Sequence, residues 1–186
     1  MTVRNEDRRV ERTRSALYCA FQSLVLERGY DAVTVQDILD CANVGRSAFY
    51  SHFKGKEALL RSGFEALQHQ LQAADESTVE TPFAFSLPLF RQAQAHAALY
   101  RAMLAGRGEL LARREFRRIL DLWIDRDLGP PASARPGRGY AVSLISGAFL
   151  GVLEHWLSGN RTAPAEELDA IFRRLLSDGA SPWLRR

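Results

Sequence analysis

Three observations predict an all-α fold. Apolar residues recur at the three- and four-residue spacing of a helix in one segment after another. Glycine and proline separate those segments, most clearly in the stretch DLGPPASARPGRG at 127–139. The chain has 186 residues, of which 46% are hydrophobic and 25% charged, so it is long enough to bury a core around such helices.

The ends of the first two helices are predicted as clearly as their apolar faces. Gly29 ends the first helix, because glycine readily takes the left-handed backbone of a helix C-terminus. Thr34 is a good N-cap for the second helix, and Asp37 completes a weak capping box. Asn43 ends that helix, since Asn tolerates the same left-handed backbone. The first helix carries an apolar stripe, and so does the second: Leu17, Ala20, Phe21, Leu24 and Val25, then Val35, Ile38, Leu39 and Ala42.

A third helix is predicted over residues 45–53, with Gly45 as its N-cap. Phe49 and Phe53 lie four residues apart and face inward, where they complete a three-helix core with the two preceding helices. The opposite face is polar and rich in hydrogen-bond donors: Arg46, Ser47, Tyr50 and Ser51, with His52 at its border.

The rest of the chain is predicted to form a helical body. A long fourth helix from about 55 to 74 precedes an acidic loop at 75–82, and Pro88 interrupts or begins the following helix. The apolar positions after Leu89 fit one helical face as far as Leu104. Three more helices follow, over about 109–128, 140–160 and 164–179.

The last two predicted helices are strongly apolar. The helix at 140–160 is apolar on nearly every side, which predicts extensive burial, and its small residues at four-residue spacing permit another helix to approach closely. These two helices form either a hairpin within one chain or a four-helix bundle with a second copy. We expect the second arrangement, and the residues at the dimer interface would be Ser143, Gly147, Gly151, Leu168, Ile171, Phe172 and Leu175.

The polar face of the helix at 45–53 suits the major groove of DNA. Arg46 can bind the O6 and N7 atoms of guanine together, Ser47 can reach a base edge, and the methyl group of Ala48 can touch thymine. A solvated surface helix is the alternative for any single helix of this kind. We expect phosphate contacts from residues around it: the amide of Thr34 and the side chains of Tyr50, His52 and Lys56.

The N-terminal segment adds charge beside this helix. Residues 1–14 contain five arginines against three acidic residues, although the net charge of the whole chain is only +3. This segment is either a frayed, solvated terminus or an arm that approaches DNA phosphate and adds salt-dependent affinity.

The first third of the chain contains an ordered set of residues: Gly29-Tyr30, Thr34-Val35, Ile38, Ala42, Val44, Phe49-Tyr50-Ser51-His52-Phe53, Lys56-Glu57 and Leu59-Leu60. This set resembles the N-terminal signature of the TetR family of transcriptional regulators. The resemblance implies a helix-turn-helix DNA-binding domain at 1–56 and a helical effector-binding and dimerisation domain at 57–186. It further implies a homodimeric repressor that binds a palindromic operator and is released by a small-molecule effector. Asn43, Gly45 and Ser47-Ala48 depart from the residues frequent in the family, which leaves the operator sequence open.

The resemblance also implies a pocket for a small, often apolar effector in the body. Aromatic residues of the body are the candidates, although each is also a natural core residue. Tyr100, Trp123 and His155 are the first choices, because each brings a polar tip to an apolar neighbourhood, and Phe116 and Trp156 are further candidate pocket residues.

Other classes of protein find less support. We expect no enzyme, no catalytic residue, no metal site and no cofactor, because neither a phosphate-binding glycine loop nor metal-ligand spacing is present. Cys19 and Cys41 are expected to be buried or half-buried thiols in a reducing cytoplasm, with a redox-sensing pair as the alternative. No signal peptide or membrane-spanning run is recognised, so we expect a cytoplasmic protein without a membrane partner. A helical dimeric ligand-binding protein without sequence-specific DNA recognition is the alternative function.

Overall fold

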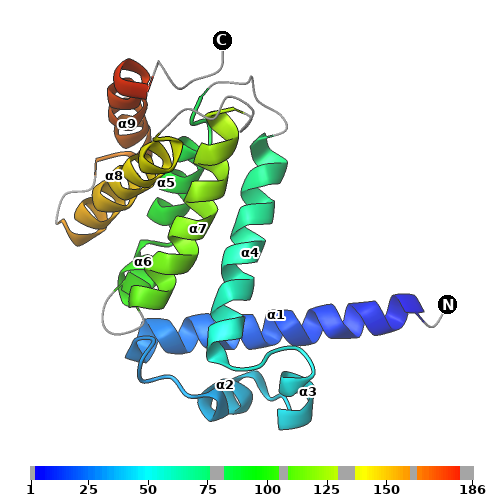
Figure 1. The fold of residues 1–186 in the computed structure, drawn as a ribbon. Coiled ribbons are helices and arrows are strands. Elements are labelled where there is room, and N and C mark those ends of the chain that lie inside the picture. The colour runs from blue at the N-terminus through cyan, green and yellow to red at the C-terminus, as the bar shows by residue number, and fades with distance from the viewer. Residues whose placement is uncertain (1–2, 76–81, 105–108, 130–136, 160–162, 181–186) are drawn as a thin grey trace.

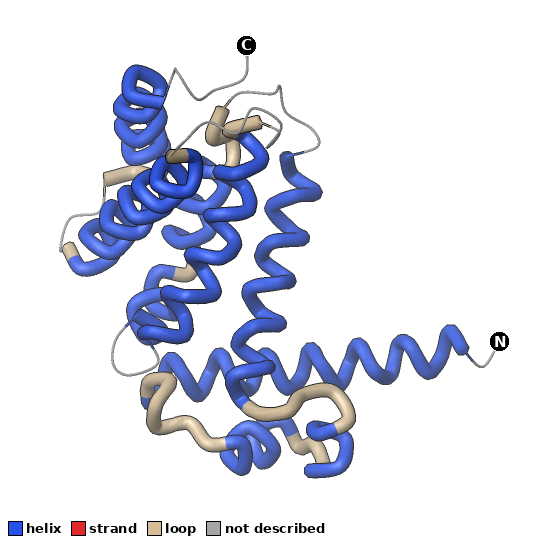
Figure 2. Tube along the Cα trace, in the orientation of Figure 1, coloured by secondary structure: helices blue, strands red, loops and turns tan. Residues whose placement is uncertain are grey.

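The computed structural model describes residues 3–75, 82–104, 109–129, 137–159 and 163–180, and these form helices joined by turns (Figure 1). Figure 2 shows no strand in this part of the chain, which agrees with the predicted all-α class. The helices in chain order are α1 (Val3–Arg28), α2 (Val35–Ala42), α3 (Arg46–Tyr50), α4 (Lys56–Asp75), α5 (Ser86–Ala95), α6 (Ala97–Leu104), α7 (Glu109–Asp127), α8 (Arg138–Ser158) and α9 (Ala165–Ala180).

Helices α1, α2 and α3 form the head of the molecule. Most residues of the predicted apolar faces are buried in it, and Leu17, Phe21, Ile38 and Phe49 are almost completely inaccessible to solvent. Val35 and Ala42 are only half-buried. Burying a side chain as large as Phe49 contributes about 1.5–3 kcal/mol, so these contacts fix the angle between the short helices. In Figure 1, α2 and α3 lie on one side of α1, and the remaining helices lie on the other side.

The turns of the head follow the predicted backbone chemistry. Thr34 caps α2 with both hydrogen bonds of a capping box, and Asn43 has a φ of 52°, in the left-handed region. Gly29 has a φ of 77° at the end of α1, and the extended Gly45 precedes α3. One predicted limit was wrong: the last helix of the head ends at Tyr50 rather than at residue 53, because Ser51 and His52 form a turn. Helix α1 begins at Val3, so the N-terminal segment is helical from that residue onward.

The body consists of α4 to α9. Helix α4 rises from the head beside α7 (Figure 1), and the two are joined by the ion pair between Arg61 Nε and the buried Glu115 Oε1 at 3.0 Å. The single helical face expected between Leu89 and Leu104 is divided into α5 and α6, because the backbone of His96 has φ −119° and ψ 30°. Pro88 lies in the first turn of α5, where a missing amide proton costs no intrahelical bond.

A cluster of aromatic rings holds the body together. Phe90 stacks on Phe149 of α8 with 4.6 Å between ring centroids, and Phe172 of α9 meets Phe149 edge to face at 5.3 Å. Such pairs add roughly 0.5–1.5 kcal/mol each to the burial of their surface. At one end of this cluster the hydroxyl group of Ser86 contacts the carboxylate of Asp169, so α5 and α9 are also joined by a buried polar contact.

Helix α8 has one buried and one exposed face. Ile145, Phe149 and Leu153 are buried against the body, whereas Tyr140 and Leu144 are 79% and 74% exposed. The expectation that α8 would be covered on nearly every side was therefore wrong for this single chain. The helix is also long and apolar enough to cross a membrane by length and composition alone, a test that core helices of soluble proteins pass as well.

Candidate nucleic-acid interface and ligand cavity

The exposed face of α3 and the residues around it form a continuous polar surface on the head. Arg46, Ser47, Ala48 and Tyr50 are all exposed, with half of the Tyr50 side chain accessible to solvent. Phe49 and Phe53 anchor the segment from the inside, where their ring centroids lie 5.8 Å apart. The other predicted contact residues lie nearby, with Thr34 exposed and His52 and Lys56 half-buried.

Arg46 is held in place by α2. Its Nη2 atom donates a hydrogen bond of 2.6 Å to Gln36 Oε1, and Gln36 Nε2 donates in turn to Asp40 Oδ1 at 2.8 Å. The guanidinium group has five N–H donors, so this bond leaves others for a partner. Gln36 and Asp40 were not predicted to belong to the site. Their four-residue spacing on the exposed face of α2 was the available signal.

Lys56 is engaged with the backbone of the head. Its ammonium group donates to the carbonyl oxygens of Tyr30, Asp31 and Val33 at 3.0, 3.4 and 2.9 Å, and it lies 4.5 Å from the centroid of the Tyr30 ring. An ammonium group has three protons, and three carbonyl groups account for them. Lys54 by contrast is exposed at the same end of α4, next to the face formed by α3.

The N-terminus of α2 is occupied by its own cap. The amide of Thr34 donates to Asp37 Oδ2 at 2.8 Å, and the amide of Asp37 donates to Thr34 Oγ1 at 3.2 Å. The hydrogen bond from the Thr34 hydroxyl group is the largest cause that lowers the pKa of Asp37 below its ordinary value. The carboxylate is thus ionised at neutral pH, and a phosphate at this end of α2 would compete with it for the Thr34 amide.

The N-terminal part of α1 carries exposed charge past the head. Arg8, Arg9 and Arg12 are exposed, and the guanidinium carbon of Arg14 lies 5.4 Å from the centroid of Phe53, the residue that anchors the α3 segment. Figure 1 shows that α1 extends beyond α3 toward the N-terminus.

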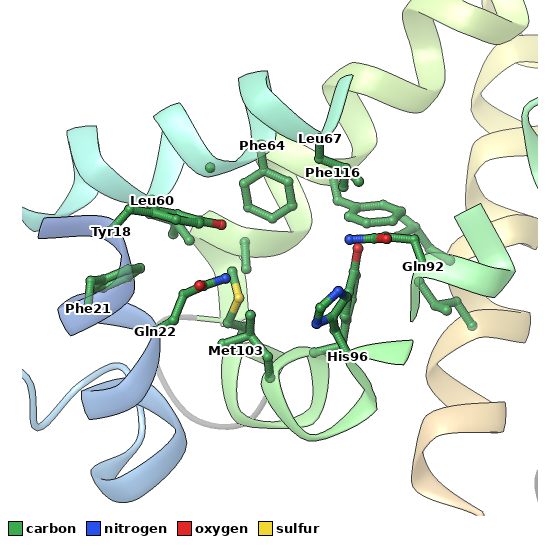
Figure 3. Close-up of a pocket in the computed structure, with 16 residues that line it drawn as sticks. Tyr18, Phe21, Gln22, Leu60, Phe64, Leu67, Gln92, His96, Met103 and Phe116 are labelled. Atoms are coloured by element: carbon green, nitrogen blue, oxygen red, sulfur yellow. The ribbon is translucent and has the colours of Figure 1, made fainter. Parts of the chain in front are cut away.

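A cavity of about 80 Å³ lies where the head meets the body. A cavity of roughly 10–15 Å³ is enough to hold one water molecule, so this cavity has room for a small ligand. Figure 3 shows Tyr18 and Gln22 of α1 on one side of it, Phe64 of α4 above, and Gln92 and His96 on the opposite side. The full lining comprises Tyr18, Phe21, Gln22, Leu60, Gly63, Phe64, Leu67, Gln92, His96, Leu99, Tyr100, Met103, Ala112, Phe116, Leu150 and Leu153.

The cavity includes two of the predicted pocket residues and not the other three. Tyr100 and Phe116 line it and meet edge to face at 6.0 Å between ring centroids. Trp123 and Trp156 are buried in the aromatic core, where Trp156 Nε1 donates to the carbonyl of Ala163 at 2.9 Å. His155 is exposed near the end of α8. The lining residues of α1 escaped prediction because that helix was assigned to the head alone.

Helices α1 and α4 approach closely beside this cavity. A Cβ atom placed on Gly63 would lie 2.5 Å from both Cε2 and the hydroxyl oxygen of Tyr18, closer than any real contact. Glycine at this position therefore lets the Tyr18 ring lie against α4. Burial is the largest cause that raises the pKa of the Tyr18 phenol, so this wall of the cavity stays uncharged at neutral pH.

Most of the predicted dimer residues are exposed on α8 and α9. Ser143, Gly147 and Gly151 are exposed on α8, and apart from the adjoining residues and backbone of α8 itself no atom lies within 4 Å of a Cβ built at either glycine. On α9, Ile171 and Leu175 are 47% and 71% exposed, Leu168 is half-buried, and Phe172 is buried inside the chain.

The described residues contain no cluster of three or more His, Cys, Asp or Glu side chains suited to a metal ion. Cys19 and Cys41 are both exposed, so the expectation of buried or half-buried thiols was wrong.

Two features define the class of protein: a three-helix head and a short, exposed third helix anchored by two phenylalanines. This is the helix-turn-helix arrangement of DNA-binding proteins. Residues 23–62 match the family model described as bacterial regulatory proteins, tetR family. The chain belongs to the TetR family of transcriptional regulators, a family of regulatory proteins rather than of enzymes.

Individual relatives agree with this assignment. The chain is 33% identical over 112 residues to the HTH-type transcriptional repressor DhaR of Mycobacterium sp. (strain GP1), covering 53% of this chain and 55% of that one. It is 44% identical over 57 residues to the uncharacterized HTH-type transcriptional regulator YxbF of Bacillus subtilis (strain 168), covering 30% and 15%. The chain thus spans about half the length of the first relative and less of the second.

A solved structure extends the similarity over most of the chain. A TetR transcriptional regulator from Streptococcus agalactiae 2603V has a TM-score of 0.72 and 26% sequence identity, with 94% of this chain and 98% of that chain covered. The architecture of both head and body is therefore that of the family.

Proposed function

We propose that this protein is a ligand-responsive transcriptional repressor that binds a palindromic DNA operator as a homodimer and is released by a small-molecule effector. The observation that carries the proposal is the donor-rich face of α3, which is exposed while Phe49 and Phe53 fix it from behind. The related DhaR is named a repressor, which supports the direction of regulation. Such a protein acts where the chromosome lies, in the cytoplasm.

In this proposal α3 enters the major groove and separates base reading from phosphate binding. Arg46, already oriented by Gln36, binds a guanine edge, with Ser47 and Ala48 beside it. Phosphate contacts come from Thr34, Tyr50 and His52, and from the exposed Lys54. The hydrogen bonds of Lys56 favour a structural role for this side chain, because its ammonium group fixes the turn between α1 and α2.

The dimer is supported by the surface of α8 and α9. Tyr140, Leu144 and Leu175 expose large apolar side chains next to the open row of Gly147 and Gly151. Exposed apolar surface of this kind marks interfaces, and two copies of such a helix pair form a four-helix bundle. A twofold pair of heads would match the two halves of a palindrome.

Selection of bound sequences from random duplex DNA by the full-length protein tests the proposal. We expect an enriched palindrome whose half-sites lie one helical turn apart or a multiple of it. Recovery of unenriched DNA at low salt would instead support the alternative, a helical dimeric ligand-binding protein without sequence recognition. An Arg46→Ala variant should lose the enrichment at one position of each half-site.

A further inference from the structure

The cavity between head and body has walls of two kinds. Most of its lining is apolar, from Leu60, Phe64, Met103 and Phe116 among others. Two amide side chains interrupt this lining from opposite sides: Gln22 on α1 and Gln92 on α5 (Figure 3). Each amide has both donor and acceptor groups, and although Gln22 also hydrogen-bonds the Tyr18 side chain, each amide retains groups that can meet a carbonyl, an amide or a hydroxyl group of a ligand.

The lining carries almost no charge. None of its side chains belongs to Asp, Glu, Lys or Arg, and its single imidazole, that of His96, is exposed to solvent. The two phenols are neutral there, because burial raises the pKa of both Tyr18 and Tyr100 above the ordinary value. An ionic ligand would lose its hydration on entering this space without gaining a buried counter-charge, which is strongly unfavourable.

The volume of the cavity and the aromatic rings that line it restrict the ligand further. The cavity volume of about 80 Å³ is smaller than that of a cavity of roughly 150 Å³ known to admit benzene, so a ligand larger than about one ring would not fit unless the lining moved. The aromatic rings of Phe64 and Phe116, 5.9 Å apart and edge to face, favour a flat apolar body between the two amides.

We propose that this cavity binds an uncharged molecule of about one ring whose hydrogen-bonding groups, at opposite ends, meet Gln22 and Gln92. This inference deepens the proposed function and rests on it for the identity of the ligand as the effector. The ligand would bridge the head and the body directly, since Gln22 belongs to the same helix as the head core residues Leu17 and Leu24. Its binding would therefore set the angle between α1 and the body.

The test uses the full-length protein and three one-ring molecules of nearly identical shape: 4-hydroxybenzamide, which is neutral, 4-hydroxybenzoate, an anion, and 4-hydroxybenzamidine, a cation. Binding is measured by calorimetry and by thermal shift without DNA. We expect the neutral compound to bind at least about tenfold more tightly than either ion. Similar affinity for all three, tighter binding of an ion, or no binding of the neutral compound would overturn the proposal.

The bridge is tested by Gln22→Leu and Gln92→Leu, with Gln94→Leu as the matched control. Gln94 lies on α5 as well, is exposed, and does not line the cavity. Each cavity variant should weaken 4-hydroxybenzamide binding roughly three- to tenfold, whereas the control should leave it unchanged. If only one of the two glutamines affected affinity, the bridge between α1 and α5 would be refuted.

Failure of this inference is distinguishable from failure of the proposed function. Operator selection does not use the compounds, and compound binding does not use DNA. Where both succeed, adding 4-hydroxybenzamide should change operator affinity by about fivefold or more, the usual scale of coupling between two sites. Unchanged operator affinity with a saturated cavity would show that the cavity does not regulate the head.

Discussion

The Nη2 atom of Arg46 lies 2.6 Å from the Oε1 atom of Gln36, so the residue proposed to read DNA on α3 is positioned by the helix before it. Gln36 is in turn held by Asp40. A guanidinium group fixed before binding loses less side-chain freedom when it meets a base.

Replacing Gln36 by Leu should therefore weaken specific DNA binding without touching the contacts of Arg46 to the base. We expect a loss of roughly three- to tenfold for the selected operator and little change for random DNA. Arg46→Ala should cost about 1–3 kcal/mol on the same operator and relax the preference at one base position. Fluorescence anisotropy on both DNAs measures this, with Gln70→Leu on the exposed surface of α4 as the control. Equal losses on both DNAs would contradict the positioning of Arg46.

Lys54 and Lys56 form a matched pair with opposite expectations. Lys56→Met removes the hydrogen bonds to the turn at Tyr30–Val33 but keeps the aliphatic stem, and should lower the free energy of unfolding by about 1–3 kcal/mol. Lys54→Met should leave stability within about 0.5 kcal/mol, because its side chain is exposed. It should also reduce the salt dependence of DNA binding by roughly one counterion. Chemical denaturation and salt titration separate the two effects.

The cap of α2 makes the stability of the head depend on pH in the acid range. The pKa of Asp37 is lowered in the folded state, first by the hydrogen bond from the Thr34 side chain, so folding favours the carboxylate. The resulting stability is fully present above the ordinary value of 3.8 and is lost as pH falls through the lower folded value. Asp37→Asn should flatten the fall in stability below pH ~4, as should Thr34→Ala. Melting curves that keep the wild-type slope in both variants would exclude this origin.

Gly151 tests the dimer without disturbing the single chain. A Cβ at this position meets no atom within 4 Å apart from the adjoining residues and backbone of α8 itself, so Gly151→Leu should fold normally. In the proposed four-helix bundle the added side chain would separate the paired helices, because a row of small residues lets helices approach closely. Sedimentation should show a monomer or a much weakened dimer, whereas Ala98→Leu, on an exposed position of α6, should behave as the wild type. A dimer of unchanged strength in Gly151→Leu would rule out this surface.

The sequence predicted what depends on local backbone chemistry and on periodic apolar faces. The cap at Thr34, the left-handed turns at Gly29 and Asn43, and the inward Phe49 and Phe53 all follow from neighbouring residues and are confirmed. The division between α5 and α6 at His96 was not predicted, because the apolar face continues across it and histidine is not a helix breaker.

Contacts between distant segments could not be predicted in the same way. Lys56 was assigned to phosphate because it lies at a helix N-terminus, yet its ammonium group reaches back to a turn 23 to 26 residues earlier. Likewise, Tyr18 lines the cavity where Gly63 lets its ring lie against α4, a contact between residues 45 positions apart. Relationships of this kind depend on how helices pack, and periodicity along one helix does not record which neighbour it meets.

Because α1 runs without a break from the head to the cavity, it limits which residues can change when such a protein acquires a new ligand. Phe21 belongs both to the core of the head and to the lining of the cavity. A substitution of Phe21 that admits a new small molecule would also change how α2 and α3 pack against α1. Gln92 and His96 face the same space from a helix that the head does not use. Changes of ligand preference should accumulate on that side, where they leave operator preference intact.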